Sequence, residues 1–271
     1  MIREITDRLK TVYGRDEARA IAQIIAEEAT GLTIGKILMN GLRLKDVPKA
    51  QEMTERALNS EPIQYITGWT MFCGNRIKCD RRALIPRPET EEMTQWILEN
   101  EKDEGLKIID IGTGSGCIAT ALAKRWSVTA MEKSEEAIGL ATENFSANRT
   151  EVRVVRDDVL SPAQEYERYD IIVSNPPYIR PSEKSLMENN VLMYEPGIAL
   201  FATEDNPLMF YKAIAEFGSR YLKKGGRFYV EINRDMGEET ANVFRLAGYA
   251  DVGIKRDMFG NNRFISGRWI R

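Results

Sequence analysis

The segment YDIIVSNPPYIRP, residues 169–181, holds polar groups whose types and order suit a chemical role. Asn175 follows an apolar run typical of a buried strand, and its side-chain carbonyl is a hydrogen-bond acceptor. Pro176 and Pro177 lack N–H groups and have a fixed φ, so this part of the chain cannot donate to a strand ladder. The backbone carbonyl of Pro176 is a second acceptor beside the first. Two adjacent acceptors suit one NH₂ group, which donates a proton to each.

This arrangement indicates methylation of an amide or an exocyclic amine. The lone pair of such a nitrogen is delocalised, and holding both protons out of plane would direct it at an electrophilic methyl group. The two acceptors would also stabilise the positive charge that develops on the nitrogen. Tyr178 offers a π-face to a planar group. We therefore predict Asn175, Pro176 and Tyr178 as catalytic residues. The predicted substrate-binding set is Asn175, Pro176, Pro177 and Tyr178.

A plain turn that ends a strand is the alternative interpretation of NPPY. Asn, Pro and Tyr each make up about a few per cent of an average protein, so the four-residue string should occur by chance in roughly one chain in a thousand. That rarity favours the functional interpretation. The chain has no histidine, which removes the commonest general base and the usual zinc sites. We therefore expect no metal, and a reaction that proceeds without a group titrating near neutrality.

The Gly-rich string DIGTGSGCIA stands where an α/β fold places its cofactor, at a strand-to-helix turn. Gly112, Gly114 and Gly116 have no side chain to block the approach of a ligand to the backbone. Glu132 lies twenty residues after Gly112, at the end of the next expected strand. A carboxylate there can accept hydrogen bonds from both ribose hydroxyls of an adenosine-containing ligand. Asp158 ends the third expected strand and is placed to meet the adenine.

The loop by itself leaves the cofactor open. Read from Gly114, GSGCIA satisfies the dinucleotide pattern of a nicotinamide enzyme. Read from Gly112, the G-x-G-x-G order resembles the S-adenosylmethionine loop of Rossmann-like methyltransferases. A Gly-rich turn without a ligand is a third interpretation, which the correctly spaced acid disfavours. A nicotinamide dehydrogenase would leave NPPY without a role.

The composition indicates which kinds of partner and which cellular compartment to expect. The formal net charge is −3 and the pI is about 5.5, which disfavours nucleic acid as the main partner. Cys73, Cys79 and Cys117 lack CxxC spacing and are typical of reduced thiols in a cytoplasmic protein. The charged N-terminus shows no secretory signal, and no uncharged stretch is long enough to span a bilayer. We expect a cytoplasmic protein without membrane partners.

The elements that must position these residues follow from the periodicity. Helical spacing dominates the first 60 residues, and a hairpin with a turn at Gly74-Asn75 is expected after them. From Leu106 onward strands and helices alternate, which predicts an α/β fold with a doubly wound sheet. We predict a small N-terminal helical domain over residues 1–75, a linker and hairpin region over 76–88, and a large domain over 89–271.

With these motifs in place, the chain resembles the release factor glutamine methyltransferase family (PrmC/HemK), which methylates the glutamine of the GGQ motif in peptide-chain release factors. The strings that carry the resemblance are EPIQYITGWTMFCG, LIPRPETE, DIGTGSGCIA, NPPYI, YEPGIALFA and RDMFGNNRF, in the order of the family. PRPETE together with NPPY is more specific than either alone, because NPPY also occurs in DNA and RNA amine methyltransferases. The resemblance implies a Rossmann-like, class I methyltransferase fold and S-adenosylmethionine as the cofactor.

The resemblance also implies roles for individual residues. The expected cofactor-binding residues are Gly112, Thr113, Gly114, Ser115, Gly116, Glu132, Asp158, Val159 and Asn175. The N-terminal helical domain would help to dock a release factor, and a monomer is expected. Three departures from the family pattern are visible: Glu132 where Asp is common, Val159 in place of a frequent aromatic, and EINRDMG without the usual Gly and Gln.

Rival functions remain at this point. The nearest is a glutamine methyltransferase for a ribosomal protein, or an amine methyltransferase for nucleic acid. The acidic pI and the lack of an obvious basic stripe disfavour nucleic acid. A catalytically idle S-adenosylmethionine-binding protein is disfavoured because the acceptor string is intact.

Overall fold

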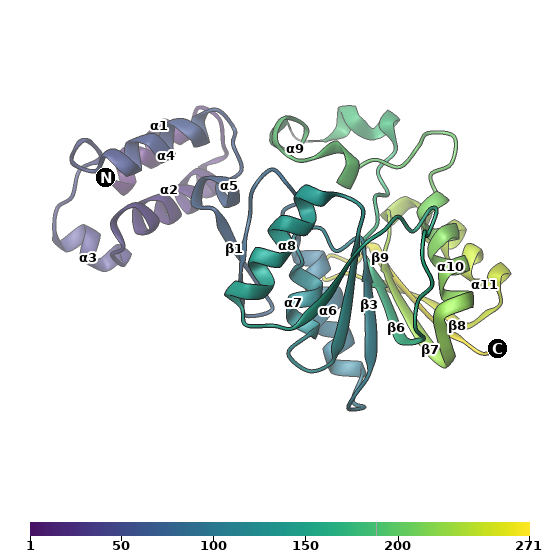
Figure 1. Ribbon diagram of the computed structural model, residues 1–271. Helices are drawn as coiled ribbons and strands as arrows, with labels where there is room; N and C mark the ends of the chain where they lie inside the picture. The colour runs from purple at the N-terminus through teal and green to yellow at the C-terminus, as the bar shows by residue number, and fades with distance from the viewer. Residues whose placement is uncertain (188) are drawn as a thin grey trace. The chain divides into compact units, whose positions relative to one another are not determined.

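The computed structural model describes residues 1–187 and 189–271, and these form two compact units (Figure 1). One unit holds Met1–Trp69 with residues 189–194, and the other holds Thr70–Met187 with Glu195–Arg271. The sequence-based domain limits of 1–75, 76–88 and 89–271 stay a prediction beside this division. No helix in the described ranges is long and apolar enough to cross a membrane.

The first unit is helical, as its periodicity predicts. Its core contains Ile5, Leu9, Ile21, Ile25 and Met53, which are all nearly inaccessible to solvent. The bounds of its helices are α1 Ile2–Leu9, α2 Arg15–Thr30, α3 Ile34–Met39, the 3₁₀ turn η1 Leu44–Asp46, α4 Pro48–Leu58, α5 Ile63–Thr67 and α9 Asn189–Tyr194.

Helix α9 comes from a distant part of the chain but belongs to this helical unit. The hydroxyl of Tyr194 donates a 3.0 Å hydrogen bond to the backbone carbonyl of Asn59. The helical unit is therefore discontinuous in sequence.

A two-stranded hairpin follows α5, with β1 at Trp69–Phe72 and β2 at Asn75–Lys78. The hairpin is confirmed, but its turn lies one residue earlier than the sequence suggests. Cys73 and Gly74 have φ angles of 46° and 71°, the left-handed conformation that tight hairpin turns require at both central positions. Asn75 begins β2, and its side-chain amide donates to the carbonyls of Phe72 and Cys73.

The second unit is built on a seven-stranded sheet in the order β5-β4-β3-β6-β7-β9-β8. The strands are β3 Lys107–Ile111, β4 Ser127–Glu132, β5 Val152–Arg156, β6 Tyr169–Ser174, β7 Leu222–Glu231, β8 Tyr249–Arg256 and β9 Asn262–Trp269. All pairings from β5 to β7 are parallel, whereas β9 runs antiparallel to β7 and β8. The predicted α/β fold is confirmed.

Helices cover both faces of this sheet (Figure 1). One face packs against α6 Pro88–Asn100, α7 Cys117–Leu122 and α8 Glu135–Ala147, and the other against α10 Met209–Tyr221 and α11 Gly237–Ala247. The short helical segments between β6 and α10 within this unit are η2 Pro181–Leu186 and η3 Gly197–Ala199, and η4 Arg234–Met236 precedes α11. The sheet is thus doubly wound.

The order of the strands reverses between β3 and β6, which is where open α/β sheets bind ligands. Ile111 of β3 lies opposite Ser174 of β6 and opposite Met131 of β4. The next residue of each strand therefore reaches the same edge of the sheet. These next residues are Gly112, Asn175 and Glu132, which come from the three motifs singled out in the sequence.

Gly116 precedes the first residue of α7, has a φ of 79° and packs against α8. A Cβ at this position would lie 2.7 Å from a ring carbon of Phe145 and 3.1 Å from the Cβ of Ala141. Both the left-handed backbone and the close approach of two helices require glycine here. Packing is therefore a sufficient reason for this glycine.

Replacing Gly116 with alanine should lower the free energy of unfolding by about 2–4 kcal/mol, because backbone strain and overpacking add. Gly105 is the matched control, since it has a φ of 70° and open space around it. Gly105→Ala should cost only the backbone strain, about 1–2 kcal/mol. Denaturant unfolding measures both values. Equal losses in the two variants would contradict the packing argument.

Candidate active site

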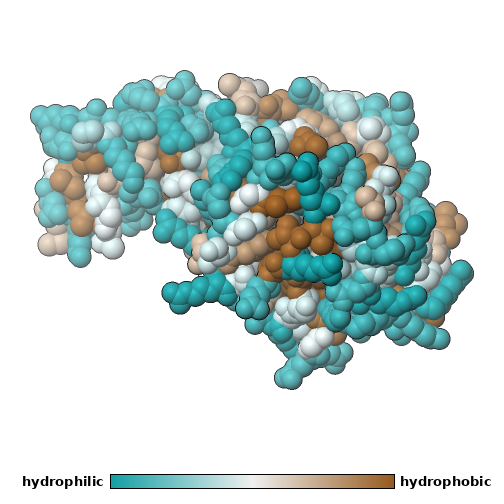
Figure 2. Space-filling view, viewed as in Figure 1, coloured by the Kyte–Doolittle hydropathy of each residue, from teal (hydrophilic) through white to brown (hydrophobic). Residues whose placement is uncertain are grey.

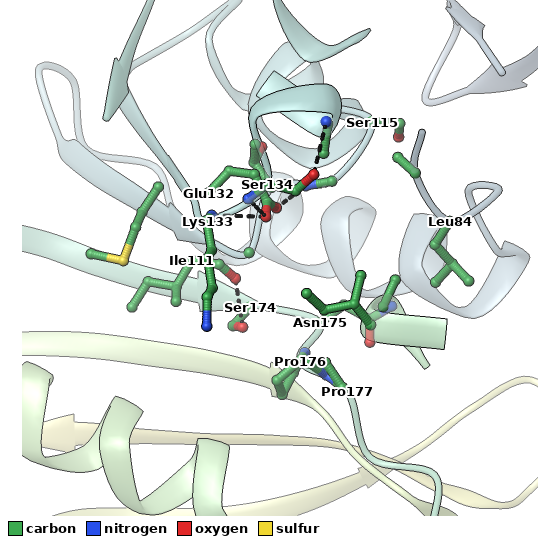
Figure 3. A pocket seen from close by; sticks show the side chains of 18 of the residues that line it. Leu84, Ile111, Ser115, Glu132, Lys133, Ser134, Ser174, Asn175, Pro176 and Pro177 are labelled. Atoms are coloured by element: carbon green, nitrogen blue, oxygen red, sulfur yellow. Dashed lines mark hydrogen bonds between the residues drawn. The ribbon is translucent and has the colours of Figure 1, made fainter. Parts of the chain in front are cut away.

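A pocket lies in the sheet unit and is bounded by the glycine loop and by residues that follow β4, β5 and β6 (Figure 3). Among the residues that line it are Leu84, Ile85, Arg87, Thr90, Gly112, Thr113, Gly114, Ser115, Glu132, Lys133, Asp158, Val159, Leu160, Asn175, Pro176, Pro177, Ile198 and Ile214. All the predicted site residues belong to the lining except Gly116 and Tyr178.

The walls of the pocket are largely apolar. Ile198 and Leu160 line it although 65% and 37% of their surfaces are exposed. Figure 2 shows hydrophobic residues gathered in the region of α8 on the face in view, with hydrophilic residues around them. The pocket itself can receive an apolar or aromatic group, because its lining combines apolar residues such as Leu84, Val159 and Ile214 with a few polar groups.

Glu132 is held rigidly at the end of β4. Its Oε1 accepts hydrogen bonds from the backbone N–H groups of Lys133 at 2.8 Å and Ser134 at 2.9 Å, and its Oε2 accepts one from Gly114 at 3.0 Å (Figure 3). The carboxylate thus links the glycine loop to the start of α8. Oε2 accepts one of these bonds and keeps a lone pair, which a ligand hydroxyl can use.

Asp157 and Asp158 follow β5 and differ in their surroundings. Asp157 is buried and accepts hydrogen bonds from the N–H groups of Asp158 and Ala163 and from the hydroxyl of Tyr166, at 2.5 Å. Asp158 is partly exposed, pairs with Lys133 at 2.8 Å and accepts a bond from the N–H of Leu160. Asp157 therefore fixes the loop, and Asp158 supplies a charged acceptor at the pocket wall.

Asp110 in β3 is a buried acid that the sequence interpretation passed over. Its Oδ2 accepts a 2.6 Å hydrogen bond from the Thr113 hydroxyl, whereas its Oδ1 has no hydrogen-bond partner among the described residues. Burial raises the pKa of Asp110 to about 7, although the Thr113 hydrogen bond acts the other way. Complete burial thus moves the pKa of one carboxyl into the range left empty by the missing histidines, while the expectation of a reaction that proceeds without such a group stays a prediction.

Asn175 lies just beyond β6, where Ser174 anchors the chain by donating a 2.7 Å hydrogen bond to the carbonyl of Ile111 (Figure 3). The Nδ2 of Asn175 donates to the hydroxyl of Thr90 at 2.9 Å. Because Nδ2 is engaged with the protein, the side-chain oxygen is the end of the amide that remains for a ligand. Pro176 and Pro177 follow directly along the same wall (Figure 3).

Tyr178 lies outside the pocket lining. Its ring packs against the core on the α10 side of the sheet, and its hydroxyl donates a 3.0 Å hydrogen bond to Glu231. Burial raises the pKa of the Tyr178 phenol well above its usual value, and the neighbouring Glu231 carboxylate adds to the shift. The predicted contact of its π-face with a substrate stays a prediction, since the ring is not part of the pocket lining.

Three residues that shape the site received no role from the sequence: Thr90, Glu195 and Glu231. Each lies inside a string that carried the family resemblance or departed from it: LIPRPETE, YEPGIALFA and EINRDMG. The buried Glu195 accepts hydrogen bonds from the backbone N–H of Ile85 at 3.0 Å and the guanidinium of Arg87 at 2.5 Å. It thereby holds residues 84–87, which form one wall of the pocket.

The pocket fits the predicted cofactor, S-adenosylmethionine. Gly112 and Gly114 have φ angles of 73° and 55°, and nothing lies within 4 Å of where a Cβ of Gly112 would stand. The loop therefore leaves free space beside its backbone. Glu132 supplies an acceptor for ribose hydroxyls, and Asp158 with the apolar Val159 suits an adenine edge and face.

Comparisons with known proteins agree with this architecture. Residues 88–195 match the family model described as methyltransferase small domain, and residues 1–68 match the PrmC N-terminal domain. A release factor glutamine methyltransferase of Bacteroides thetaiotaomicron is 38% identical over 269 residues, which cover 97% of this chain and 96% of that protein. One of Lactococcus lactis is 45% identical over 221 residues, covering 79% and 80%.

Solved structures show the same fold at low sequence identity. A crystal structure of a methyltransferase from Pyrococcus furiosus has a TM-score of 0.55 at 19% identity, covering 73% of this chain and 90% of that one. A Thermus thermophilus 16S rRNA methyltransferase in complex with AdoMet and guanosine has a TM-score of 0.53 at 16% identity, covering 74% and 49%. The predicted Rossmann-like, class I methyltransferase fold is confirmed.

Replacing Asp110 with asparagine should raise stability in a pH-dependent way. The pKa of Asp110 rises from 3.8 to about 7 on folding, so the wild type loses stability as the pH rises through about 7. The stability advantage of Asp110→Asn should therefore be largest at about pH 8 and smaller by about 2 kcal/mol at about pH 5.5. Thermal unfolding across this range measures it, and a constant difference would refute the titration.

Asp157 is a control for Asp110, because folding lowers its pKa instead of raising it. Burial favours a higher pKa there, but hydrogen bonds from Tyr166 and Ala163 outweigh it and lower the pKa of Asp157. The stabilisation that this carboxylate provides is present above its unfolded pKa and is lost at acid pH. Asp157→Asn should therefore destabilise the protein, most strongly at about pH 8.

Proposed function

The chain belongs to the release factor glutamine methyltransferase family, and from that premise we propose that it methylates the side-chain amide nitrogen of the glutamine in the GGQ motif of peptide-chain release factors, with S-adenosylmethionine as the methyl donor. The observation that carries this proposal is the orientation of Asn175. Its amide nitrogen is bound to Thr90, and its oxygen is left as an acceptor in a pocket that the glycine loop also lines.

The acceptors would bind and orient the substrate amide. Asn175 Oδ1 and the carbonyl of Pro176 would each accept one hydrogen bond from the glutamine NH₂ group. This holds the nitrogen with its lone pair directed across the pocket and stabilises the positive charge that develops on it. S-adenosylmethionine, when bound, supplies an electrophilic methyl group on sulfur. Transfer of this methyl group would form a nitrogen–carbon bond as the carbon–sulfur bond breaks with its electron pair left on sulfur, and the nitrogen would lose one of its two protons to solvent.

The cofactor assignments follow the pocket wall. Gly112, Thr113, Gly114 and Ser115 line the part next to the glycine loop, and Glu132 offers a fixed carboxylate oxygen for ribose. Asp158 and Val159 border the region proposed for adenine. Gly116 contributes to this site through packing with Phe145, which fixes the loop that precedes α7.

We further propose that the protein acts as a cytoplasmic monomer with no direct nucleic-acid partner. The net charge of −3 supports the absence of a nucleic-acid partner, since binding to phosphate backbones draws on a surplus of basic residues. The helical unit, Met1–Trp69 with residues 189–194, is the proposed docking element for the release factor.

Purified protein incubated with methyl-labelled S-adenosylmethionine should label a bacterial release factor on its GGQ glutamine. A release factor with that glutamine replaced by alanine should take up no label above background. Ribosomal proteins and ribosomal RNA serve as parallel substrates, and their labelling in place of the release factor would replace the substrate assignment. Equal labelling of the two release factors would also refute it.

Asn175→Ala should lower the turnover number by about 100-fold or more, since it removes an oriented polar group that contacts the reacting nitrogen. Binding of S-adenosylmethionine should be largely kept, because the glycine loop, Glu132 and Asp158 stay in place although Asn175 is itself an expected cofactor contact. Asn148→Ala is the control, because Asn148 ends α8 and bonds to the carbonyls of Arg76 and Asn144, away from the pocket lining. Wild-type turnover in Asn175→Ala would exclude the proposed role.

A further inference from the structure

Asn175 can serve the proposed reaction in only one of its two amide orientations. With Oδ1 toward the pocket, Asn175 accepts a hydrogen bond from the substrate NH₂ group. With Nδ2 toward the pocket, the NH₂ groups of Asn175 and of the substrate, which are both donors, would face each other. The two orientations have nearly the same shape, so packing alone discriminates poorly between them. Something chemical must select the productive one.

A chain of hydrogen bonds provides this selection. Asn175 Nδ2 lies 2.9 Å from Thr90 Oγ1, and Thr90 Oγ1 lies 2.6 Å from Glu231 Oε2. A threonine hydroxyl has one proton, and at 2.6 Å from a carboxylate oxygen that proton is directed at Glu231. Thr90 therefore presents only lone pairs to Asn175. The Asn175 side chain must therefore donate to Thr90 with its NH₂ group, which leaves Oδ1 toward the pocket.

Glu231 determines which group is donor and which is acceptor in these hydrogen bonds. Its second oxygen, Oε1, accepts a hydrogen bond from the Tyr178 hydroxyl at 3.0 Å, so each carboxylate oxygen accepts a hydrogen bond from a hydroxyl group. Burial raises the pKa of Glu231, and the hydrogen bonds from Thr90 and Tyr178 and the charge of Arg263 offset only part of that rise. The acceptor role of Glu231 follows from the geometry, because a hydroxyl donor faces each of its two oxygens, at 2.6 Å and 3.0 Å. Glu231 thereby sets the direction of the hydrogen bonds that lead to Asn175.

Solvent cannot replace these bonds. Thr90 is 3% exposed and Glu231 is 1% exposed. Thr90 lies in the first turn of α6 and Glu231 at the end of β7, so two rigid elements carry the chain of bonds. A buried acceptor that loses its donor is costly, so the arrangement resists reorientation.

We propose that Thr90 and Glu231 are positioning residues, which hold Asn175 with its oxygen toward the substrate amide through the hydrogen bonds Glu231–Thr90–Asn175. This inference rests on the proposed function for the identity of the group that Asn175 accepts. The orientation of Asn175 itself is independent of the substrate.

Thr90→Val tests the inference, because valine keeps the shape of threonine and removes the hydroxyl. The turnover number should fall by about 10-fold to 100-fold, the factor that corresponds to a lost buried hydrogen bond. The dissociation constant of S-adenosylmethionine should remain near the wild-type value. Thr90→Ser keeps the hydroxyl and should restore most of the turnover. A serine variant as slow as the valine variant would overturn the hydrogen-bond explanation.

Thr94→Val is the matched control. Thr94 lies one turn further along α6, is fully buried, and donates its hydroxyl to the backbone carbonyl of Thr90 at 2.9 Å. Its replacement makes the same chemical change at the same depth but leaves the chain of bonds intact. It should keep wild-type turnover and lower stability less than Thr90→Val, because it leaves no buried carboxylate short of a donor. Equal turnover losses in both valine variants would overturn the proposal in favour of a general packing effect.

Glu231→Gln completes a double-mutant cycle. A glutamine can turn its NH₂ group toward Thr90 and reverse the polarity of the chain, so it should also slow turnover. Because both residues act through the same amide, the double variant Thr90→Val, Glu231→Gln should be no slower than the slower single variant. If the double variant lost turnover by the product of the two single losses, Thr90 and Glu231 would act independently. That result would contradict a relay, by which we mean the hydrogen bonds Glu231–Thr90–Asn175 acting together.

A measurement without substrate separates this inference from the proposed function. The side-chain NH₂ resonances of Asn175, assigned by their absence in Asn175→Ala, should shift in Thr90→Val and stay unchanged in Thr94→Val. Unchanged resonances in Thr90→Val overturn the relay even if the release factor is methylated. Shifted resonances in an enzyme that methylates no release factor would support the relay and refute the proposed substrate.

Discussion

In the seven-stranded sheet, Ile111 of β3 pairs with Ser174 of β6, and Ser174 adds a side-chain hydrogen bond to the carbonyl of Ile111. This parallel register is the constraint on which the site depends. It brings the glycine loop and NPPY to one edge although about 60 residues separate them in the chain. A slip of one residue would send Asn175 to the opposite face of the sheet.

Buried carboxylates hold further parts of the site in place, in addition to the strand register. Glu195 fixes the wall at residues 84–87, Asp157 fixes the loop after β5, and Glu231 orders the bonds that reach Asn175. A buried charge is unfavourable unless donors surround it, and each of these acids collects at least two. Buried acids that are each held by several donors thus take over positioning tasks in a chain that has no histidine.

The sequence predicts much of this architecture because local patterns decide it. Alternating strands and helices, the glycine loop and the strand-ending acid all follow from short-range periodicity and spacing, and the family inferred from NPPY with PRPETE agrees with the relatives. The remaining features depend on long-range contacts. Thr90 and Glu231 are 141 residues apart, and Ile85 and Glu195 are 110 apart, so no local pattern reveals either pair. The raised pKa of Asp110 likewise follows from burial that a sequence does not display.

The discontinuity of the helical unit has a consequence for how such a protein can be divided. The backbone leaves this unit after Trp69, returns ahead of Asn189 and departs again after Tyr194. A single proteolytic cut after Trp69 therefore severs only one of the covalent connections. A fragment that starts at Thr70 would carry the six-residue helix Asn189–Tyr194 without Asn59, to which Tyr194 bonds. An evolutionary exchange of the helical unit would likewise need two simultaneous replacements, one at the N-terminus and one inside the sequence of the other unit.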